Sequence, residues 1–386
     1  MPTVIFGLAV MSIIAVAALS TSSDERRASR AVRESTMALY AAEAGLRQTY
    51  GAWPKAPVKA LNPGDSLDLG WQTLSTNSSY RTVIHRMDKG GIQEYNVVVQ
   101  GRRTGLNGGV STILGVVGGV PVFTYGVYAK TNISLGGNGR LDGYDSEQAP
   151  YDALTADSTA NLWSNGTMDI NRTTVLGNAS ATGSITTGTG VNVTGGLTSG
   201  ADPAPPMDIN ACPATGFTPA ANVPNGAGIS YNASTGVLSV AAGAVVNLTG
   251  SQYFFSRVIL QGNSSITVNP PAGSRVEVIV SDSVNLSGGS VTNLSGVPTR
   301  LGFSSCGSPT PERTWVLTGG SGAAFSVYAP NHPVIVTGGG DLFGAVVSSS
   351  YTATGGAELH YDAALARIGA DKLIVHRATW AMLPGG

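Results

Sequence analysis

No proline stands between Pro2 and Pro54, so the start of the chain can form one uninterrupted helix. An apolar run occupies residues 4–19 and a charged segment follows it. Residues 28–47 are rich in Ala, Leu, Glu and Arg, which favour helices. We therefore predict a long helix over residues 1–55, with a packing seam at near-heptad spacing. The seam residues are Val32, Leu39, Ala42 and Leu46.

The first 20 residues have about the length that spans a bilayer. They lack the basic leading region and the small-residue cleavage site of a secretory signal, although a cleaved signal peptide is the alternative interpretation. We expect this helix to lie in a membrane first and then to pack against neighbouring helices in an assembly. The side chains expected at that interface are Val4, Ile5, Phe6, Leu8, Val10, Ile13, Ile14 and Leu19.

The composition favours β-structure beyond the helix. The chain has 52 glycines and only 12 % charged residues, with many Thr, Ser, Asn and Val residues, which predicts strands and tight turns rather than disorder. The net charge of −1 gives no reason to expect nucleic acid as a partner. Strand-like runs at 80–85, 92–100 and 110–117 predict a small antiparallel sheet within residues 56–120, packed on the second half of the helix.

A repeat of 19 residues follows in the remaining domain, residues 121–386. The segments that begin at Val246, Ser265 and Val284 follow one another at this spacing, and 258–260 is answered by 277–280. The same spacing relates 315–320 to 334–339 and 326–329 to 345–348. A fixed period with inward apolar residues is typical of stacked coils. The fold class is therefore predicted as mainly β, with a parallel β-helix (solenoid) head after the helix and small sheet.

Two irregular segments interrupt this repeat. Residues 126–137 are similar to residues 326–339, which suggests one type of coil at the entry and exit of one solenoid, and 371–380 is expected to be a last strand closing the head. Cys212 and Cys306 lie in or next to the irregular segments 202–206 and 297–311. Because the N-terminal helix implies export, we predict a Cys212–Cys306 disulfide, with two free thiols as the alternative.

The segment 37–47 contains Ala-Ala-Glu-Ala-Gly-Leu at 41–46 and resembles PilX-type pilins of bacterial type IV pili. The C-terminal part resembles a pilin-associated β-helix region through 328–331, 338–345 and 360–365. Many type IV pilins carry a glutamate at the fifth mature position that pairs with a neighbouring subunit. Here Ile5 stands at that position if Met1 is the first mature residue.

The resemblance implies a structural filament subunit without enzyme activity or cofactor. Its partners would be other copies or other pilins through the helix, the assembly machinery of the inner membrane, and surface glycans or cells. It would lie in the inner membrane and then in an extracellular filament on the bacterial surface. Two alternatives are a low-copy minor or tip pilin that primes assembly and mediates adhesion, and a membrane-tethered β-helix enzyme that acts on polysaccharides.

The acidic residues Asp142, Asp145 and Glu147 form the one candidate metal site. Calcium prefers several oxygen ligands on a flexible loop, but this spacing matches no strict calcium loop, so a solvated loop is the expectation. The four histidines have no zinc spacing, and the chain has neither a Gly-x-Ser-x-Gly elbow nor a phosphate loop. No catalytic residue is predicted.

Overall fold

The computed structural model describes residues 2–53, 57–58, 61–89, 92–104, 108–119, 122–204, 207, 209–271, 273–318, 323–367, 373–374 and 381–383. Within these ranges, the side chains of 2–10, 12–19, 88–89, 92–93, 117–119, 373–374 and 381–383 are not described. The chain forms two compact units. Unit 1 is Met1–Val120 with Leu373–Gly386, and unit 2 is Pro121–Lys372.

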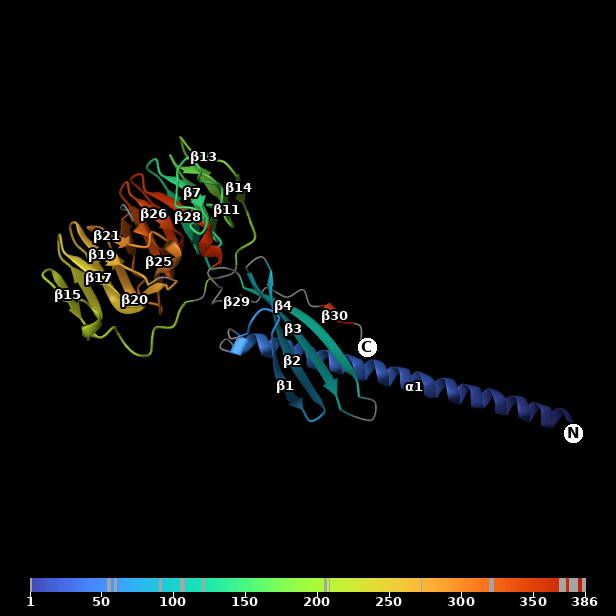
Figure 1. Cartoon of the computed structure of the whole chain (residues 1–386). Helices are drawn as coiled ribbons and strands as arrows, with labels where there is room; N and C mark the ends of the chain where they lie inside the picture. The colour runs from blue at the N-terminus through green and yellow to red at the C-terminus, as the bar shows by residue number, and fades with distance from the viewer. Residues whose placement is uncertain are drawn as a thin grey trace. The chain divides into compact units, whose positions relative to one another are not determined.

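Unit 1 is one long helix packed on an antiparallel sheet (Figure 1). Helix α1 runs from Pro2 to Gly51, and the sheet has the order β1-β2-β3-β4. The strands are β1 (Ser66–Ser75), β2 (Ser78–Lys89), β3 (Ile92–Arg103) and β4 (Val110–Gly119). The predicted helix and antiparallel sheet are confirmed, and β1 precedes the three strands that were predicted.

The C-terminus belongs to unit 1, which corrects the predicted head of residues 121–386. Strands β29 (Leu373–Ile374) and β30 (Ala381–Leu383) both pair antiparallel with β4. The predicted closing strand 371–380 is therefore replaced by two short strands, and residues 371–372 and 375–380 lie outside the described set. The physical reason is that β4 would otherwise be an open sheet edge with unpaired backbone groups.

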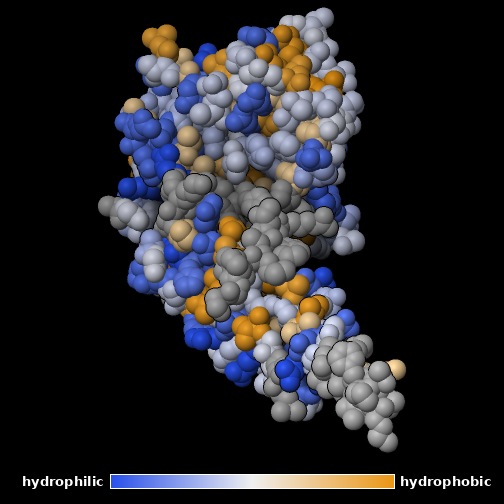
Figure 2. All heavy atoms as spheres, turned by 90° about the vertical axis from the view of Figure 1, so that its right-hand side faces the viewer, coloured by the Kyte–Doolittle hydropathy of each residue, from blue (hydrophilic) through white to orange (hydrophobic). Residues whose placement is uncertain are grey.

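Unit 2 consists of short strands that pair in parallel with one another. Among its described residues, every strand pairing is parallel except β15–β16. Alternate residues point inward, as in β19, where Ser264, Ile266 and Val268 are buried, and together they form one continuous apolar core. On the face shown in Figure 2, hydrophilic residues are interspersed with small groups of hydrophobic ones.

The first group of strands in unit 2 comprises β5 (Val127–Ala129), β6 (Asn132–Leu135), β7 (Arg140–Tyr144), β8 (Leu162–Ser164), β9 (Thr167–Ile170), β10 (Thr174–Val175), β11 (Asn178–Ala181), β12 (Ile185–Thr187), β13 (Asn192–Val193) and β14 (Gly196–Ser199). The second group comprises β15 (Ile229–Asn232), β16 (Val237–Val240), β17 (Val245–Leu248), β18 (Gln252–Leu260), β19 (Ser264–Val268), β20 (Val276–Asn285), β21 (Gly289–Asn293), β22 (Leu301–Ser305), β23 (Trp315–Thr318), β24 (Ala323–Ala324), β25 (Ser326–Thr337), β26 (Asp341–Gly344), β27 (Val346–Ala353) and β28 (Glu358–Asp362). Three short 3-10 helices are η1 (Ala220–Asn222), η2 (Pro298–Arg300) and η3 (Ala363–Arg367).

The chain enters this stack in its middle. The longest sheet has the order β14-β11-β8-β5-β27-β25-β22-β20-β18-β16-β15, so β5 pairs with β27, more than two hundred residues later in the chain. From β5 the chain proceeds outward to β14 at one end. It then crosses to β15 at the other end and returns inward to β27 (Figure 1).

The sequence predicts that the similar segments 126–137 and 326–339 mark the entry and exit of one solenoid. Both β5 and β25 pair with β27, so the similar segments are separated by a single strand near the middle. The true ends, β14 and β15, come from the middle of the sequence.

The 19-residue spacing holds in one part of unit 2 and fails in another. Trp315 pairs with Val334 and Val327 with Val346, each 19 residues on, as predicted. Ile266 instead pairs with Val291, 25 residues on, so the predicted 265-to-284 relation is wrong. Likewise 258–259 pairs with 284–285 rather than with 277–280. The spacing is longer where Pro270 and Pro271 stand between β19 and β20.

Candidate functional site

Helix α1 packs closely on the sheet through small residues. Ala38 and Ala42 are buried, and the backbone of β3 passes directly beneath them at Gly101. A Cβ atom at Gly101 would lie 2.1 Å from the Ala38 carbonyl oxygen and 2.4 Å from the Ala42 nitrogen. Any larger residue would therefore push the helix off the sheet, because backbone atoms cannot give way as a flexible side chain can.

The sheet ends at the middle of the helix. Arg103 of β3 forms an ion pair with Glu34 at 2.8 Å, and Ser111 donates a hydrogen bond to the Ser35 carbonyl at 3.2 Å. The part of α1 before Glu34 extends beyond the sheet of unit 1 (Figure 1). This half of the helix is the first candidate functional element.

The predicted seam residues fall into two groups: those that the sheet covers and one that lies beyond the sheet. Ala42 and Leu46 are buried in the core of unit 1 and Leu39 packs against it, whereas Val32 is 67 % exposed. Val32 lies beyond the sheet, so nothing in unit 1 covers it. Tyr40 is also 58 % exposed, because it faces away from the sheet.

The predicted interface residues at the N-terminus have side chains outside the described set. These residues are Val4, Ile5, Phe6, Leu8, Val10, Ile13, Ile14 and Leu19. Among the residues open to this test, no helix has both the length and the hydropathy of a membrane span. The predicted membrane stage stays a prediction.

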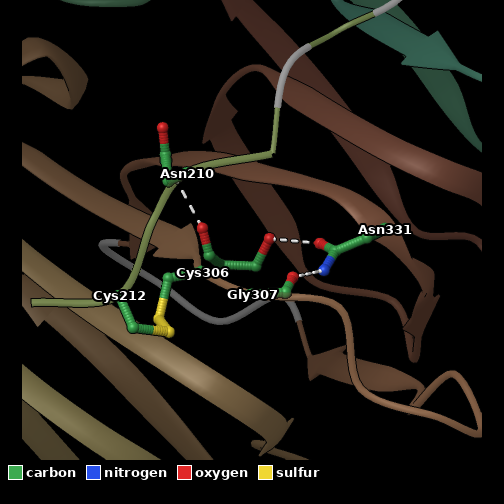
Figure 3. Close-up of a disulfide and its surroundings, with 6 residues drawn as sticks. Asn210, Cys212, Cys306, Gly307 and Asn331 are labelled. Carbon is green, nitrogen blue, oxygen red and sulfur yellow. Dashed lines mark hydrogen bonds between the residues drawn. A yellow bond between two sulfur atoms is a disulfide. The ribbon is translucent and has the colours of Figure 1, made fainter.

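The segment 200–228 connects the two ends of the stack, and we call it the return segment. Cys212 in this segment forms a disulfide with Cys306, which is buried at the end of β22 (Figure 3). Next to it, the Gly307 N–H donates to the Asn210 carbonyl at 2.9 Å. Asn331 accepts a hydrogen bond from Ser305 at 2.6 Å and donates one to the Gly307 carbonyl. The structure thus contains the predicted bridge between Cys212 and Cys306.

Two further points hold the return segment against the stack. Near its start, the Asn165 side chain donates to the Ala204 carbonyl and accepts from the Ala204 N–H, both at 2.9 Å. Near its end, the Thr218 N–H donates to the Phe254 carbonyl at 3.0 Å, and the Phe254 N–H donates to the Thr218 hydroxyl at 2.7 Å. The segment is therefore bonded to coils on both sides of the middle of the stack.

The three acidic residues of the candidate calcium loop do not converge. Asp145 and Glu147 both accept hydrogen bonds from Arg367, at 2.5 and 3.0 Å. Burial raises the pKa of Asp145, but the hydrogen bond from Arg367, together with bonds from Gln148 and the Glu147 N–H, lowers this pKa below its usual range. An arginine therefore occupies the place that a cation would take between these carboxylates.

Asp142 points elsewhere and is fully buried. Its carboxylate accepts hydrogen bonds from Arg140 at 2.5 Å and Tyr151 at 2.9 Å, and it lies 2.6 Å from Nδ1 of His360. Burial raises the pKa of Asp142, but the contacts with His360, Tyr151 and Arg140 lower this pKa below its usual value. Sequence reasoning missed the His360 partner, because 218 residues separate it from Asp142 and only the pairing of β28 with β7 joins them.

A hollow of about 320 Å³ opens beside this network in unit 2. It has an aromatic wall of Tyr144, Tyr151 and Phe343, with Ser146 and Ser295 as polar neighbours. Ligand sites in proteins begin at about 300 Å³ and combine apolar walls with a few polar groups. The hollow is therefore large enough for one small ring, such as a sugar unit.

Two family models match parts of the chain. Residues 3–47 match the PilX N-terminal family, and residues 239–368 match a domain of unknown function (DUF7305). The N-terminal part of the chain is therefore type IV pilin-like, as the segment 37–47 predicted.

A solved structure, the competence-associated pilin ComZ from Thermus thermophilus, is 14 % identical to the chain. The match covers 91 % of this chain and 96 % of that chain, with a TM-score of 0.27, which does not establish a shared fold. No curated protein matches the chain.

Proposed function

We propose that the chain is a pilin of a type IV pilus-like filament, in which helix α1 builds the filament core and unit 2 is the surface-exposed head. The observation that carries the proposal is the half of α1 that extends beyond its own sheet, since this segment lies within the PilX-type match to residues 3–47. Other copies or other pilins would be its partners through this helix. The assembly machinery of the inner membrane would move it from the membrane into an extracellular filament.

Two exposed apolar side chains on α1 support such contacts. Val32 and Tyr40 are eight residues apart, which places them about 80° apart around a helix of 3.6 residues per turn. Each would contribute roughly 1.5–3 kcal/mol if a neighbouring helix covered it fully. The gain from the N-terminal apolar run would be small relative to lipid, since helices in a bilayer already have apolar surroundings. The direction of assembly must then come from packing and from the assembly machinery.

We further propose that the stacked parallel strands of unit 2 are a β-helix. Parallel pairing such as β17-β19-β21 on one face and β26-β28-β7 on another supports this fold. Its backbone groups pair with the coils above and below, which suits a head exposed outside the cell. The disulfide supports export as well, because such bridges persist in oxidising compartments.

The test changes the apolar half of α1 without touching unit 2. Ile13→Asp places a carboxylate where neighbouring helices would meet, and Ile13→Leu is the matched control that keeps an apolar side chain. We expect Ile13→Asp to abolish filaments seen by electron microscopy, while the exported head keeps its β circular dichroism and its disulfide. Filaments of normal number from Ile13→Asp would refute the proposal.

The hollow in unit 2 favours a second role, a low-copy minor or tip pilin whose head mediates adhesion. Its aromatic wall of Tyr144, Tyr151 and Phe343 suits an apolar ring face. Val297 lines the hollow, so Val297→Trp should fill it, and Leu197→Trp on β14 is the control at an exposed position outside the hollow. Glycan-array binding that Val297→Trp abolishes and Leu197→Trp keeps would support adhesion. Labelling of subunits at filament ends rather than along the length would separate the two roles.

A further inference from the structure

Three neighbouring strands of unit 2 bring a histidine and three carboxylates to one outward-facing surface. Asp341 of β26 pairs in register with Glu358 of β28, and His360 of β28 pairs with Asp142 of β7. Because side chains alternate along a strand, Glu358 and His360 share the face opposite the core residue Leu359. The carboxylates and the imidazole therefore meet on the face of the sheet that points away from the core.

The His360 ring is held in one orientation. Only 2 % of its side chain is exposed, and it contacts the rings of Tyr151 and Phe343 at centroid distances of 4.0 and 4.8 Å. Its Nδ1 lies 2.6 Å from the Asp142 carboxylate, which also accepts from Tyr151 and Arg140. Since a carboxylate with these donors is an acceptor, Nδ1 donates its hydrogen to Asp142, and Nε2 is the ring nitrogen that remains for a cation.

The Nε2 atom faces the other two carboxylates. The Glu358 Oε2 atom lies 3.6 Å away and the Asp341 Oδ1 atom 4.0 Å away, both longer than a hydrogen bond. Among the described residues, neither carboxylate forms an ion pair with an arginine or a lysine. The structure thus places a ring nitrogen and two carboxylates close together without a hydrogen bond between the ring nitrogen and either carboxylate, and nitrogen and carboxylate oxygen atoms are donors that zinc accepts.

We propose that Asp341, Glu358 and His360 bind a zinc-like divalent cation, with Asp142 as the positioning residue for the imidazole. Their three ligand atoms lie within 4.8 Å of one another, and a tetrahedral zinc site needs separations of about 3.3 Å. The Asp341 and Glu358 side chains are 47 % and 36 % exposed, so small rotations can close this difference. The imidazole selects zinc over calcium or magnesium, which prefer oxygen ligands alone.

The arrangement also includes the carboxylate that commonly supports a metal-binding histidine. A histidine that binds a metal through one ring nitrogen commonly donates the other N–H to a carboxylate, which fixes the ring and raises its basicity. Asp142 makes this contact here. Three protein ligands leave one position open to solvent, where a water molecule or a ligand group could bind.

The test is calorimetric titration of the full chain with ZnCl2 at pH 7, after EDTA treatment and dialysis. We expect one zinc ion per chain with a Kd of ~1 μM or tighter, weaker by a factor of about 100 in His360→Gln and about 10 in Glu358→Gln. Asp142→Asn should weaken binding about 10- to 100-fold by releasing the ring, and CaCl2 should give no comparable binding. Glu147→Gln is the matched control, since this nearby carboxylate pairs with Arg367.

Each outcome decides the question. Failure of the wild-type chain to bind zinc, or equal binding by Glu358→Gln and wild type, would overturn the proposal. Glu358 is partly exposed, so its variant tests the site even if His360→Gln does not fold.

Discussion

Removal of the Cys212–Cys306 disulfide should destabilise unit 2 without changing its strands. The bridge closes a loop whose ends are 94 residues apart in the sequence. For a loop of about this length, the chain-entropy relation gives roughly 4–5 kcal/mol at 25 °C, because the unfolded chain regains the freedom that the bridge had removed. With a urea m-value of about 3 kcal/mol/M, the unfolding midpoint should fall by about 1.3–1.7 M.

The assay is urea unfolding followed by far-UV circular dichroism, on the oxidised chain, on the chain reduced with a phosphine, and on Cys212→Ala/Cys306→Ala. Reduction changes only the covalent bond, so it controls for the small cavity that Cys306→Ala leaves in a buried site. Both forms should lose stability together. A midpoint within about 0.2 M of the oxidised chain in both would refute the view that the return segment depends on the bridge.

Three further changes follow from particular contacts. Gly101→Ala should detach the helix from the sheet and raise amide exchange in residues 38–49, since its methyl group would meet the Ala38 carbonyl; Gly51→Ala, where an added methyl group would meet nothing within 4 Å, is a control for loss of a glycine. Asn165→Ala should cost about 2–3 kcal/mol in urea unfolding, because the buried polar groups of Ala204 lose both partners. Asp145→Asn should cost about 1–2 kcal/mol at pH 7. The folded pKa of Asp145 is lowered, so its stabilisation is present above the unfolded pKa of about 3.9 and is lost as pH falls through the folded pKa. The difference between wild type and Asp145→Asn should therefore vanish in urea titrations near pH 2, and a constant difference down to that pH would contradict the ion pair with Arg367.

Local sequence patterns predicted the parts of the fold that local forces determine. The proline-free N-terminus forms helix α1, and the runs around 80–85, 92–100 and 110–117 form antiparallel strands. The 19-residue spacing held where successive coils have equal turns, as between Trp315 and Val334. It failed between β19 and β21, where Ile266 pairs with Val291, because similar residue types alone do not determine which strands pair.

The order of coils and the histidine site were beyond local reasoning. Nothing near Val127 in the sequence indicates that it will pair with Val346, since that choice depends on which edge remains open after the other coils have stacked. The same closure brings His360 to Asp142. A scan for zinc motifs with short spacings therefore could not find a site whose parts come from β7, β26 and β28.

The crossing of the return segment has a consequence for how heads of different size could arise. Both outer faces of the stack, at β14 and β15, adjoin the stretch 200–228, whereas the strands that lead to unit 1 meet in the middle. Extra coils inserted on either side of this stretch would lengthen the head at one end or the other. The β5–β27 pairing would keep its neighbours, so the length of unit 2 can vary while the middle of its longest sheet stays constant.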